Sequence, residues 1–302
     1  MKHDLCHGAA WMNGTVIPIS QAAIPVNDWG LVHSDITYDV VPVIDGAFFR
    51  FDEYLARFLS SMENLHLDPG MSKRDIKAAL HQMVSKSRLR DSYVAMVCSR
   101  GKPKIAGSRD PRDCDNHFFA WCVPYVHVIK PEVVEQGATA WIAQNAYRIP
   151  ENSVNPRVKN YHWGDFTQGI FEAKDKNYET VILLDYDGNV TEGPGFNVFA
   201  VKDKVLITPD RGVLAGVSRK TVLEMAEHLG INTSVRSLSV EELLEADEVF
   251  LSSSGGGVIP IIRVNETIFG NGASGPISVQ LNETYWAWTT LEKYRDPIDY
   301  EP

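Results

Sequence analysis

Two residue pairs that end in glycine, each set between apolar runs, place the strongest constraint on the fold. Asn13-Gly14 separates "AAWM" from "TVIP", and Asp45-Gly46 separates "YDVVPVI" from "AFFR". Such pairs favour two-residue turns, because the tight turn between antiparallel strands needs positive φ at its central positions. The chain is therefore predicted to open with β-hairpins rather than with a bundle of helices.

Two helices are predicted to follow the second hairpin. The stretch 51–67, "FDEYLARFLSSMENLHL", carries apolar residues at helical spacing, and Asp52 is its predicted N-cap. Ser72 and Asp75 form a capping-box pattern, which predicts a second helix that ends near Lys86. Strands and helices thus alternate in this part of the chain.

The rest of the chain continues this alternation and contains one clear break. A helix is predicted from Ser218, as its N-cap, to a stop at Gly230. Pro124 and Pro131 bracket the short stretch "YVHVIK", which is typical of a linker. We predict an α/β (α+β) fold of two domains with mixed sheets. The parts are a smaller N-terminal α/β domain (1–124), an interdomain linker (125–131) and a larger C-terminal domain (132–302).

The composition excludes several classes of partner. The formal net charge is -10, with 44% apolar and 23% charged residues. This is the composition of an ordinary globular protein, and its negative charge argues against nucleic acid or an anionic membrane as the main partner. The N-terminal sequence has no apolar core of a signal peptide, and no apolar run approaches the roughly 18 residues of a membrane span. We therefore predict a cytoplasmic protein with no nucleic-acid and no membrane partner.

The four cysteines predict neither disulfides nor a metal site. Cys6, Cys98, Cys114 and Cys122 contain no C-x-x-C pair, so free buried thiols in a reducing compartment are expected. Cys114 and His117 have the spacing of metal ligands, but no second pair accompanies them.

Two stretches have the features of anion-binding sites. In "LAGVSRKTV", the N–H groups of Val217 and Ser218 lie at a predicted helix start, where the helix dipole favours a phosphate. In "SSSGGG", three hydroxyls from Ser252 to Ser254 precede a flexible backbone that can also surround a phosphate. Each pattern alone also fits an ordinary capped helix or a glycine-rich turn.

A lysine and a glutamate complete the candidate chemistry. Lys159 lies in "NPRVKNYHWGD" beside several rings, and a partly desolvated lysine becomes a nucleophile that can form a Schiff base. Glu192 precedes the glycines of "EGPGFN", where the backbone can pass close to a flat ligand. Either residue alone could be an ordinary surface residue. Together, a lysine, phosphate sites and a carboxylate match the requirements of pyridoxal 5′-phosphate (PLP).

The motifs extend this match along nearly the whole chain. They include "DWGLVHSDITYDV", "RFDEYLARFLSSMENL", "VKNYHWGD", "TEGPGFNVF", "GVSRKTV" and "FLSSSGGGVIPI". The chain resembles the fold type IV PLP-dependent aminotransferases, the superfamily of the branched-chain and D-amino-acid aminotransferases. Within it, "VKNYHWGD" with "HSDITYDV" is most similar to the (R)-selective amine transaminases.

The resemblance implies a role for each matching residue. Lys159 would be the catalytic Schiff-base lysine, Glu192 would bond the pyridine nitrogen, and Arg57 would bind the phosphate. Val217 and Ser218 would offer N–H groups to the phosphate, and Ser254 a hydroxyl. The residues that would line the substrate pockets are His33, Tyr38, Val40, Tyr93, Trp163 and Ser253. The fold of the family implies a homodimer.

Two positions depart from the family pattern. The loop after "SRG" often carries an arginine that binds the carboxylate of a keto acid, and Ala106 stands at that place here. Lys104 or Arg109 would have to substitute. Tyr93 stands where the amine branch often has phenylalanine, so a hydroxyl changes the polarity of the pocket floor.

The resemblance thus predicts a transaminase that moves an amino group from an (R)-primary amine to a keto acid such as pyruvate by a ping-pong mechanism. Lys159 would serve as general base and then as general acid. The alternatives are a D-amino-acid or branched-chain aminotransferase, an aminodeoxychorismate-type PLP lyase, and a non-enzymatic binding protein with a decayed site.

Overall fold

The structure is a computed structural model that describes residues 5–300, so the outermost ends of the two predicted domains, 1–4 and 301–302, lie outside it. The chain forms two compact units. Unit 1 contains the chain up to Val126, Val158–His162, and the chain from Leu291 onward, and unit 2 contains His127–Arg157 and Trp163–Thr290. The predicted boundaries assign all of 132–302 to the second domain, so the structure differs for Val158–His162 and for the segment from Leu291.

Backbone pairing explains this difference. Asn160 forms an isolated β-bridge with Thr37 of unit 1. Near the C-terminus, β16 (Arg295–Pro297) pairs antiparallel with β4 (Ala47–Phe49). Pairing between residues so far apart in sequence cannot be read from local spacing.

The sheet of unit 1 is antiparallel in every pairing, whereas mixed sheets are predicted for both domains. Both predicted hairpins are confirmed, with β1 paired to β2 and β3 paired to β4. Direct connections between antiparallel neighbours account for the β1–β2, β3–β4 and β5–β6 pairs. Across the sheet the strands are β16, β4, β3 (Ile36–Ile44), β5 (Ser92–Pro103), β6 (Cys114–Pro124), β1 (Ala9–Met12) and β2 (Thr15–Pro18).

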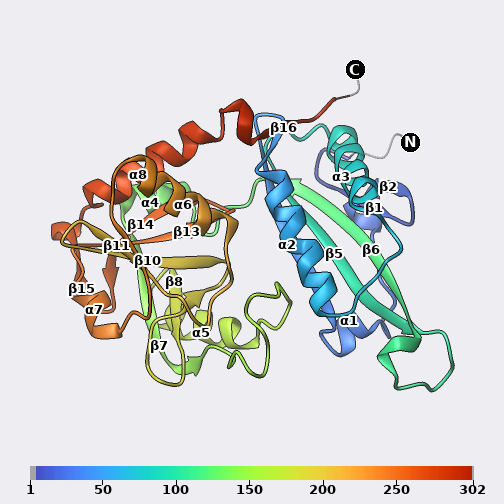
Figure 1. Ribbon diagram of the computed structural model, residues 1–302, viewed down its shortest axis with the longest axis horizontal. Coiled ribbons are helices and arrows are strands. Elements are labelled where there is room, and N and C mark those ends of the chain that lie inside the picture. The colour runs from blue at the N-terminus through green and yellow to red at the C-terminus, as the bar shows by residue number, and fades with distance from the viewer. Residues whose placement is uncertain (1–4, 301–302) are drawn as a thin grey trace. The chain divides into compact units, whose positions relative to one another are not determined.

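Three α-helices belong to the described part of unit 1: α1 (Trp29–Val32), α2 (Phe51–Asn64) and α3 (Lys73–Ser87). Helices α2 and α3 pack against its sheet (Figure 1). The predicted capping box of Ser72 and Asp75 is confirmed. The prediction of Asp52 as N-cap is wrong, because Arg50 takes that position with φ 55° and Asp52 lies in the first turn, 3.1 Å from Nζ of Lys73.

The sheet of unit 2 is mixed, as predicted. Its β12–β11, β14–β7 and β7–β8 pairs are parallel, and the others are antiparallel. The order is β12 (Thr233–Val235), β11 (Val205–Thr208), β10 (Phe196–Lys202), β13 (Glu248–Ser253), β14 (Gly257–Val264), β7 (Ala138–Tyr147) and β8 (Thr180–Leu184). Two short strands join its flanks: β15 (Thr267–Ile268) pairs with β14, and β9 (Glu192–Gly193) pairs with β10.

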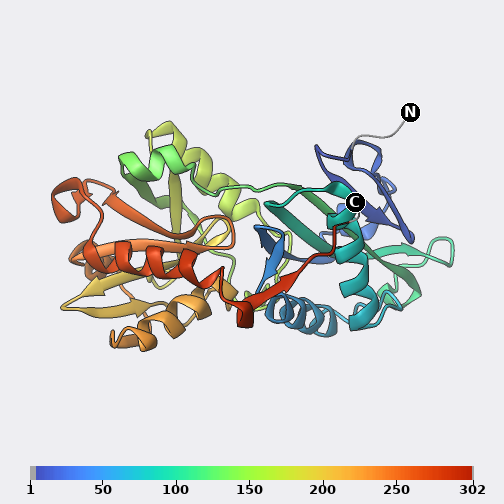
Figure 2. The same ribbon diagram turned by 90° about the horizontal axis from the view of Figure 1, so that it is seen from above.

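Five α-helices occur among the described residues of unit 2: α4 (Pro131–Gln136), α5 (Gly164–Asp175), α6 (Val217–His228), α7 (Val240–Leu244) and α8 (Pro276–Trp288). Helix α5 packs on β7 and β8, while α6 and α8 pack on one another and on β13 (Figures 1 and 2). The prediction of Ser218 as N-cap is wrong, because the cap is Gly216 and Ser218 lies within α6. Gly230 follows the end of α6 with φ +69°, as predicted. No described helix combines the length and the apolar character that a membrane crossing requires.

Short 3-10 helices connect some of these elements, at Ile19–Gln21, Pro111–Asp113, Gly270–Gly272 and Glu292–Tyr294. The four cysteines have free thiols, as predicted. Cys98, Cys114 and Cys122 are buried, but Cys6 is exposed, which differs from the prediction.

Candidate active site

The backbone of Lys159 forms three hydrogen bonds within unit 1. Its carbonyl oxygen accepts hydrogen bonds from Thr37 Oγ1 at 2.6 Å and from the Tyr38 backbone N–H at 3.3 Å. Its own N–H donates to Oγ of Ser61, a buried residue of α2, at 3.3 Å. Strand β3 and helix α2 therefore fix the point from which the lysine side chain extends.

An aromatic surface receives the lysine side chain. Nζ of Lys159 lies 4.6 Å from the centre of the Tyr38 ring. Tyr161 stacks on the same ring, with centroids 4.1 Å apart and planes 11° from parallel. The face of an aromatic ring attracts a cation, and Lys159 is only partly exposed, so its ammonium is more constrained than that of an ordinary surface lysine.

Arg57 of α2 is bound to a buried carboxylate that the sequence analysis missed. Its Nε and Nη2 donate to the two oxygens of Asp39 on β3, at 2.8 and 2.6 Å. Burial by itself would lower the pKa of Arg57, but the Asp39 carboxylate outweighs that effect and raises it. Arg57 is therefore a fixed cation, and Asp39, which stands within "HSDITYDV", is its positioning partner.

The predicted pocket residues of unit 1 are divided between a core face and the surface. Tyr38, Val40 and Tyr93 belong to one apolar cluster on β3 and β5. Burial raises the pKa of the Tyr93 phenol, and Tyr38 and Asp39 add to this shift. His33 is exposed and packs edge-on against Trp29, with ring centroids 4.6 Å apart. The structure thus brings Tyr38, Val40 and Tyr93 together and leaves His33 outside their cluster.

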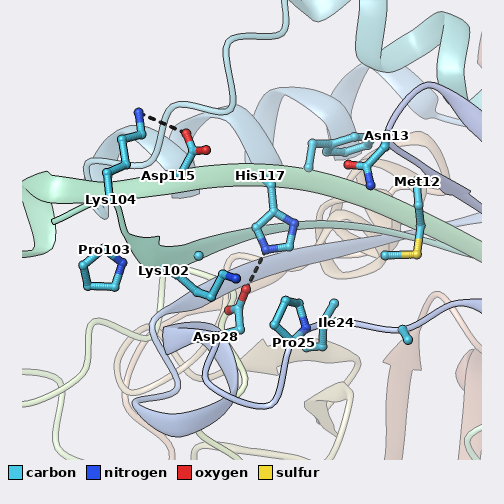
Figure 3. A pocket seen from close by; sticks show the side chains of 13 residues that line it. Met12, Asn13, Ile24, Pro25, Asp28, Lys102, Pro103, Lys104, Asp115 and His117 are labelled. Carbon is cyan, nitrogen blue, oxygen red and sulfur yellow. Dashed lines mark hydrogen bonds and ion pairs between the residues drawn. The ribbon is translucent and has the colours of Figure 1, made fainter. Parts of the chain in front are cut away.

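The loop between β5 and β6 borders a cavity of about 370 Å³ in unit 1 (Figure 3). Lys104 forms an exposed ion pair with Asp115, with Nζ 3.1 Å from Oδ1. His117, the residue with ligand-like spacing to Cys114, instead contacts Asp28, with Nε2 2.7 Å from Oδ2. Arg109 is exposed on the same loop. Of the two predicted carboxylate-binding cations, Lys104 therefore already has an anionic partner.

Glu192 is a buried anion at the centre of a hydrogen-bond network in unit 2. Its Oε2 accepts from the backbone N–H of Leu214 at 2.8 Å and from Nδ2 of Asn197 at 3.3 Å. Its Oε1 accepts from Nε of Arg148 at 3.2 Å. Glu192 is therefore not an exposed turn residue, and its partners Asn197 and Arg148 were not predicted from the sequence.

The start of α6 is shaped by a close approach of the backbone to Asn197. Gly216 is the N-cap, and no side chain caps the helix there. A Cβ on Gly216 would lie 2.2 Å from Oδ1 of Asn197, so only glycine fits without a shift. Val217 and Ser218 are buried in the first turn that follows. No side chain competes for the cap at this helix start, and a helix start favours an anion.

The serine stretch at the end of β13 contains an unsatisfied hydroxyl. Ser252 is buried, and its Oγ has no hydrogen-bond partner in the described chain. The hydroxyl of Ser253 donates to the carbonyl of Gly195 at 2.8 Å, which ties the serines to the glycine turn after Glu192. Ser254 is half-buried next to them. A buried orphan hydroxyl is uncommon and fits a site for a polar ligand.

Trp163 is the N-cap residue of α5 and packs edge-on against Phe166, with centroids 5.4 Å apart. Among the predicted site residues, those that belong to unit 2 are Glu192, Val217, Ser218, Ser253, Ser254 and Trp163. Lys159, Arg57, Tyr38, Val40 and Tyr93 belong to unit 1.

Comparison with known proteins identifies a family. Residues 37–264 match the model of "Amino-transferase class IV". The chain is 28% identical over 278 residues to a putative branched-chain-amino-acid aminotransferase of Methanocaldococcus jannaschii, covering 91% of this chain and 94% of that protein. It is 29% identical over 273 residues to the D-alanine aminotransferase of Bacillus licheniformis, covering 88% and 92% of the two chains.

Solved structures show the same fold. The branched-chain aminotransferase of Thermoproteus uzoniensis with norvaline superposes with a TM-score of 0.87 at 26% identity, covering 96% of this chain and 99% of that one. The branched-chain amino acid aminotransferase of Thermobaculum terrenum in its PLP-form gives a TM-score of 0.84 at 24% identity, covering 96% and 98%.

Proposed function

The chain belongs to the amino-transferase class IV family, and from this premise we propose that it moves an amino group from an (R)-primary amine to a keto acid such as pyruvate. As a member of this family it is a PLP-dependent aminotransferase of fold type IV. The proposal concerns the donor, the acceptor and the role of each residue, and it includes a homodimer.

The described residues fit the cofactor. In unit 2, Glu192 is a buried carboxylate for the ring nitrogen. The start of α6, which no side chain caps, and the unsatisfied Ser252 hydroxyl suit a phosphate group. Lys159 and Arg57 of unit 1 supply the amine and a cation. Bound PLP supplies an aldehyde that captures amines and a ring that accepts electrons.

The geometry around Lys159 carries the proposal. Thr37 and Ser61 bind its backbone, which fixes the point from which the side chain extends. As general base, Nζ takes the proton from the α-carbon of the donor, and as general acid it returns a proton in the same half-reaction. The keto acid then enters as the second substrate, so the amine and keto-acid half-reactions occur in turn.

The character of unit 1 favours an amine donor that has no carboxylate. Tyr38, Val40 and Tyr93 form an apolar cluster that suits a hydrocarbon substituent. Ala106 offers no cation, and Lys104 is paired with Asp115. A buried substrate carboxylate without a partner is unfavourable, so a carboxylate-free donor fits these residues better, and the carboxylate of the acceptor requires the remaining predicted cation of the loop, Arg109.

A second candidate follows from the relatives, which are named branched-chain and D-alanine aminotransferases. Activity should be measured on (R)- and (S)-1-phenylethylamine, D- and L-alanine, and L-leucine under one condition with pyruvate, and on L-leucine with 2-oxoglutarate. We expect (R)-1-phenylethylamine to dominate. Dominant activity on L-leucine with 2-oxoglutarate, or on D-alanine without (R)-1-phenylethylamine, would assign the protein to one of the other two groups.

The role of Lys159 is tested in the same assays. Lys159→Ala should abolish turnover, and borohydride reduction of the holoenzyme should place the pyridoxyl group on Lys159. Lys176→Ala is a matched control, because Nζ of Lys176 also lies over a ring, that of Trp141, at 4.7 Å. Near-normal turnover by Lys159→Ala, or a pyridoxyl group on another lysine, would contradict the assignment.

A further inference from the structure

A buried arginine lies between two carboxylates in unit 2. Nε of Arg148 donates to Oε1 of Glu192 at 3.2 Å, and Nη1 donates to Oδ2 of Asp165 at 2.6 Å. The Arg148 side chain is 8% exposed, and those of Asp165 and Glu192 are 6% exposed. One cation is thus shared by two anions that water scarcely reaches.

The backbone holds this arginine and its first carboxylate in place. The Arg148 N–H donates to the carbonyl of Leu184 at 2.8 Å, and its guanidinium lies 4.4 Å from the centre of the Phe166 ring. Asp165 lies in the first turn of α5, and its Oδ2 also accepts from the Ile149 N–H at 3.0 Å. The position of the cation is therefore set by the fold.

Groups of unit 2 hold both oxygens of the Glu192 carboxylate. Its Oε2 accepts from two groups of the chain, Leu214 and Asn197, while Oε1 accepts from Arg148. Without Arg148, Glu192 and Asp165 would lose the cation they share, and a buried charge without a partner is strongly unfavourable.

We propose that Arg148 is a positioning residue which, anchored by Asp165, keeps Glu192 ionised and correctly oriented and thereby keeps the ring nitrogen of bound PLP protonated. This inference rests on the proposed role of Glu192 at that nitrogen. Arg148 acts only through Glu192, so its effect should appear in the protonation of the ring as well as in the rate.

The test uses holoenzyme loaded with PLP that carries ¹⁵N in its ring, since the ¹⁵N chemical shift distinguishes a protonated from a neutral pyridine. We expect a protonated ring in the wild type and a neutral ring in Arg148→Met, with kcat lowered on the order of 10²-fold. Arg148→Lys retains the charge and should largely restore the protonated signal. Arg148→Gln, which keeps a donor but no charge, provides the same test if Arg148→Met does not fold.

Two further variants separate the possible failures. Arg263→Met is a matched control, because the Arg263 guanidinium lies 4.5 Å from the centre of the Tyr178 ring in the same unit, and its ring signal should stay protonated. Glu192→Gln should give a neutral ring. A protonated ring in Glu192→Gln would overturn the proposed role of Glu192 itself. If the ring is neutral in Glu192→Gln but stays protonated in both Arg148→Met and Arg148→Gln, only the proposed role of Arg148 is overturned.

Discussion

Replacing Gly216 by alanine should disturb the network around Glu192 through Asn197. The new Cβ would lie 2.2 Å from Oδ1 of Asn197, a distance that non-bonded atoms do not tolerate, so the amide must turn away. Turning it breaks the bonds from Nδ2 to the Leu214 carbonyl, at 3.0 Å, and to Oε2 of Glu192, at 3.3 Å. A neutral hydrogen bond contributes about 1 kcal/mol and one to a charged group about 1.5–3 kcal/mol. We therefore expect the free energy of unfolding to fall by about 3 kcal/mol, roughly a hundredfold in the folding equilibrium.

Urea unfolding of the PLP-free protein measures this loss without any contribution from the cofactor. Gly164→Ala is the control, because nothing lies within 4 Å of its would-be Cβ, and we expect a change below about 1 kcal/mol. Asn197→Ala should lose about as much as Gly216→Ala, and the double variant should lose little more than either. Additive losses in the double variant, or full stability of Gly216→Ala, would refute this account of the glycine.

Two other predictions concern the acceptor and the response to pH. Arg109→Ala should raise the KM for pyruvate more than the KM for the amine, with Lys104→Ala as the parallel test; if neither changes the pyruvate KM, the acceptor carboxylate binds elsewhere. Burial lowers the pKa of His81 from its ordinary value of 6.5, with Asp296 opposing and Lys77 adding to the shift. Its contribution to stability is thus present above pH 6.5 and is lost as the pH falls through the lowered pKa. The free energy of unfolding, measured with urea, should therefore fall less in His81→Gln than in the wild type when the pH is lowered from about 7.5 to 5. An equal fall in both proteins would argue against this role for His81.

Features set by a few neighbouring residues could be predicted from the sequence. The turns at Asn13-Gly14 and Asp45-Gly46 and the capping box at Ser72 depend on local dihedral preferences and local hydrogen bonds, and all three occur. The two wrong N-caps show the limit of this approach. Asp52 and Ser218 are favourable cap residues, but Arg50 and Gly216 take the cap positions. The cap residue of α6, Gly216, lies close to Asn197, and this tertiary contact cannot be read from the local sequence.

The residues of the candidate site also fall into two groups, those that sequence motifs indicate and those that only tertiary contacts reveal. Lys159, Arg57 and Glu192 could be named because they stand within recognisable motifs. Their partners Asp39 and Arg148 could not, since an ion pair between a strand and a distant segment leaves no periodic trace in the sequence. A weak signal did exist, because a charged residue inside an otherwise apolar strand pattern, such as Asp39 in β3, requires a partner.

The segment Val158–His162 has a consequence for how the chain acquires its structure during synthesis. The polypeptide passes between the units at 126–127, 157–158, 162–163 and 290–291, so neither unit is a continuous stretch of sequence. Strand β4 obtains its neighbour β16 only after almost the entire chain has been made. Until then, the outer edge of β4 is open to pairing with another chain, as unpaired edge strands are. A fragment cut at the linker would lack both the Asn160 bridge and β16. The residues around Lys159 thus come together only after synthesis has passed the linker, and the segment before the linker does not contain all of them.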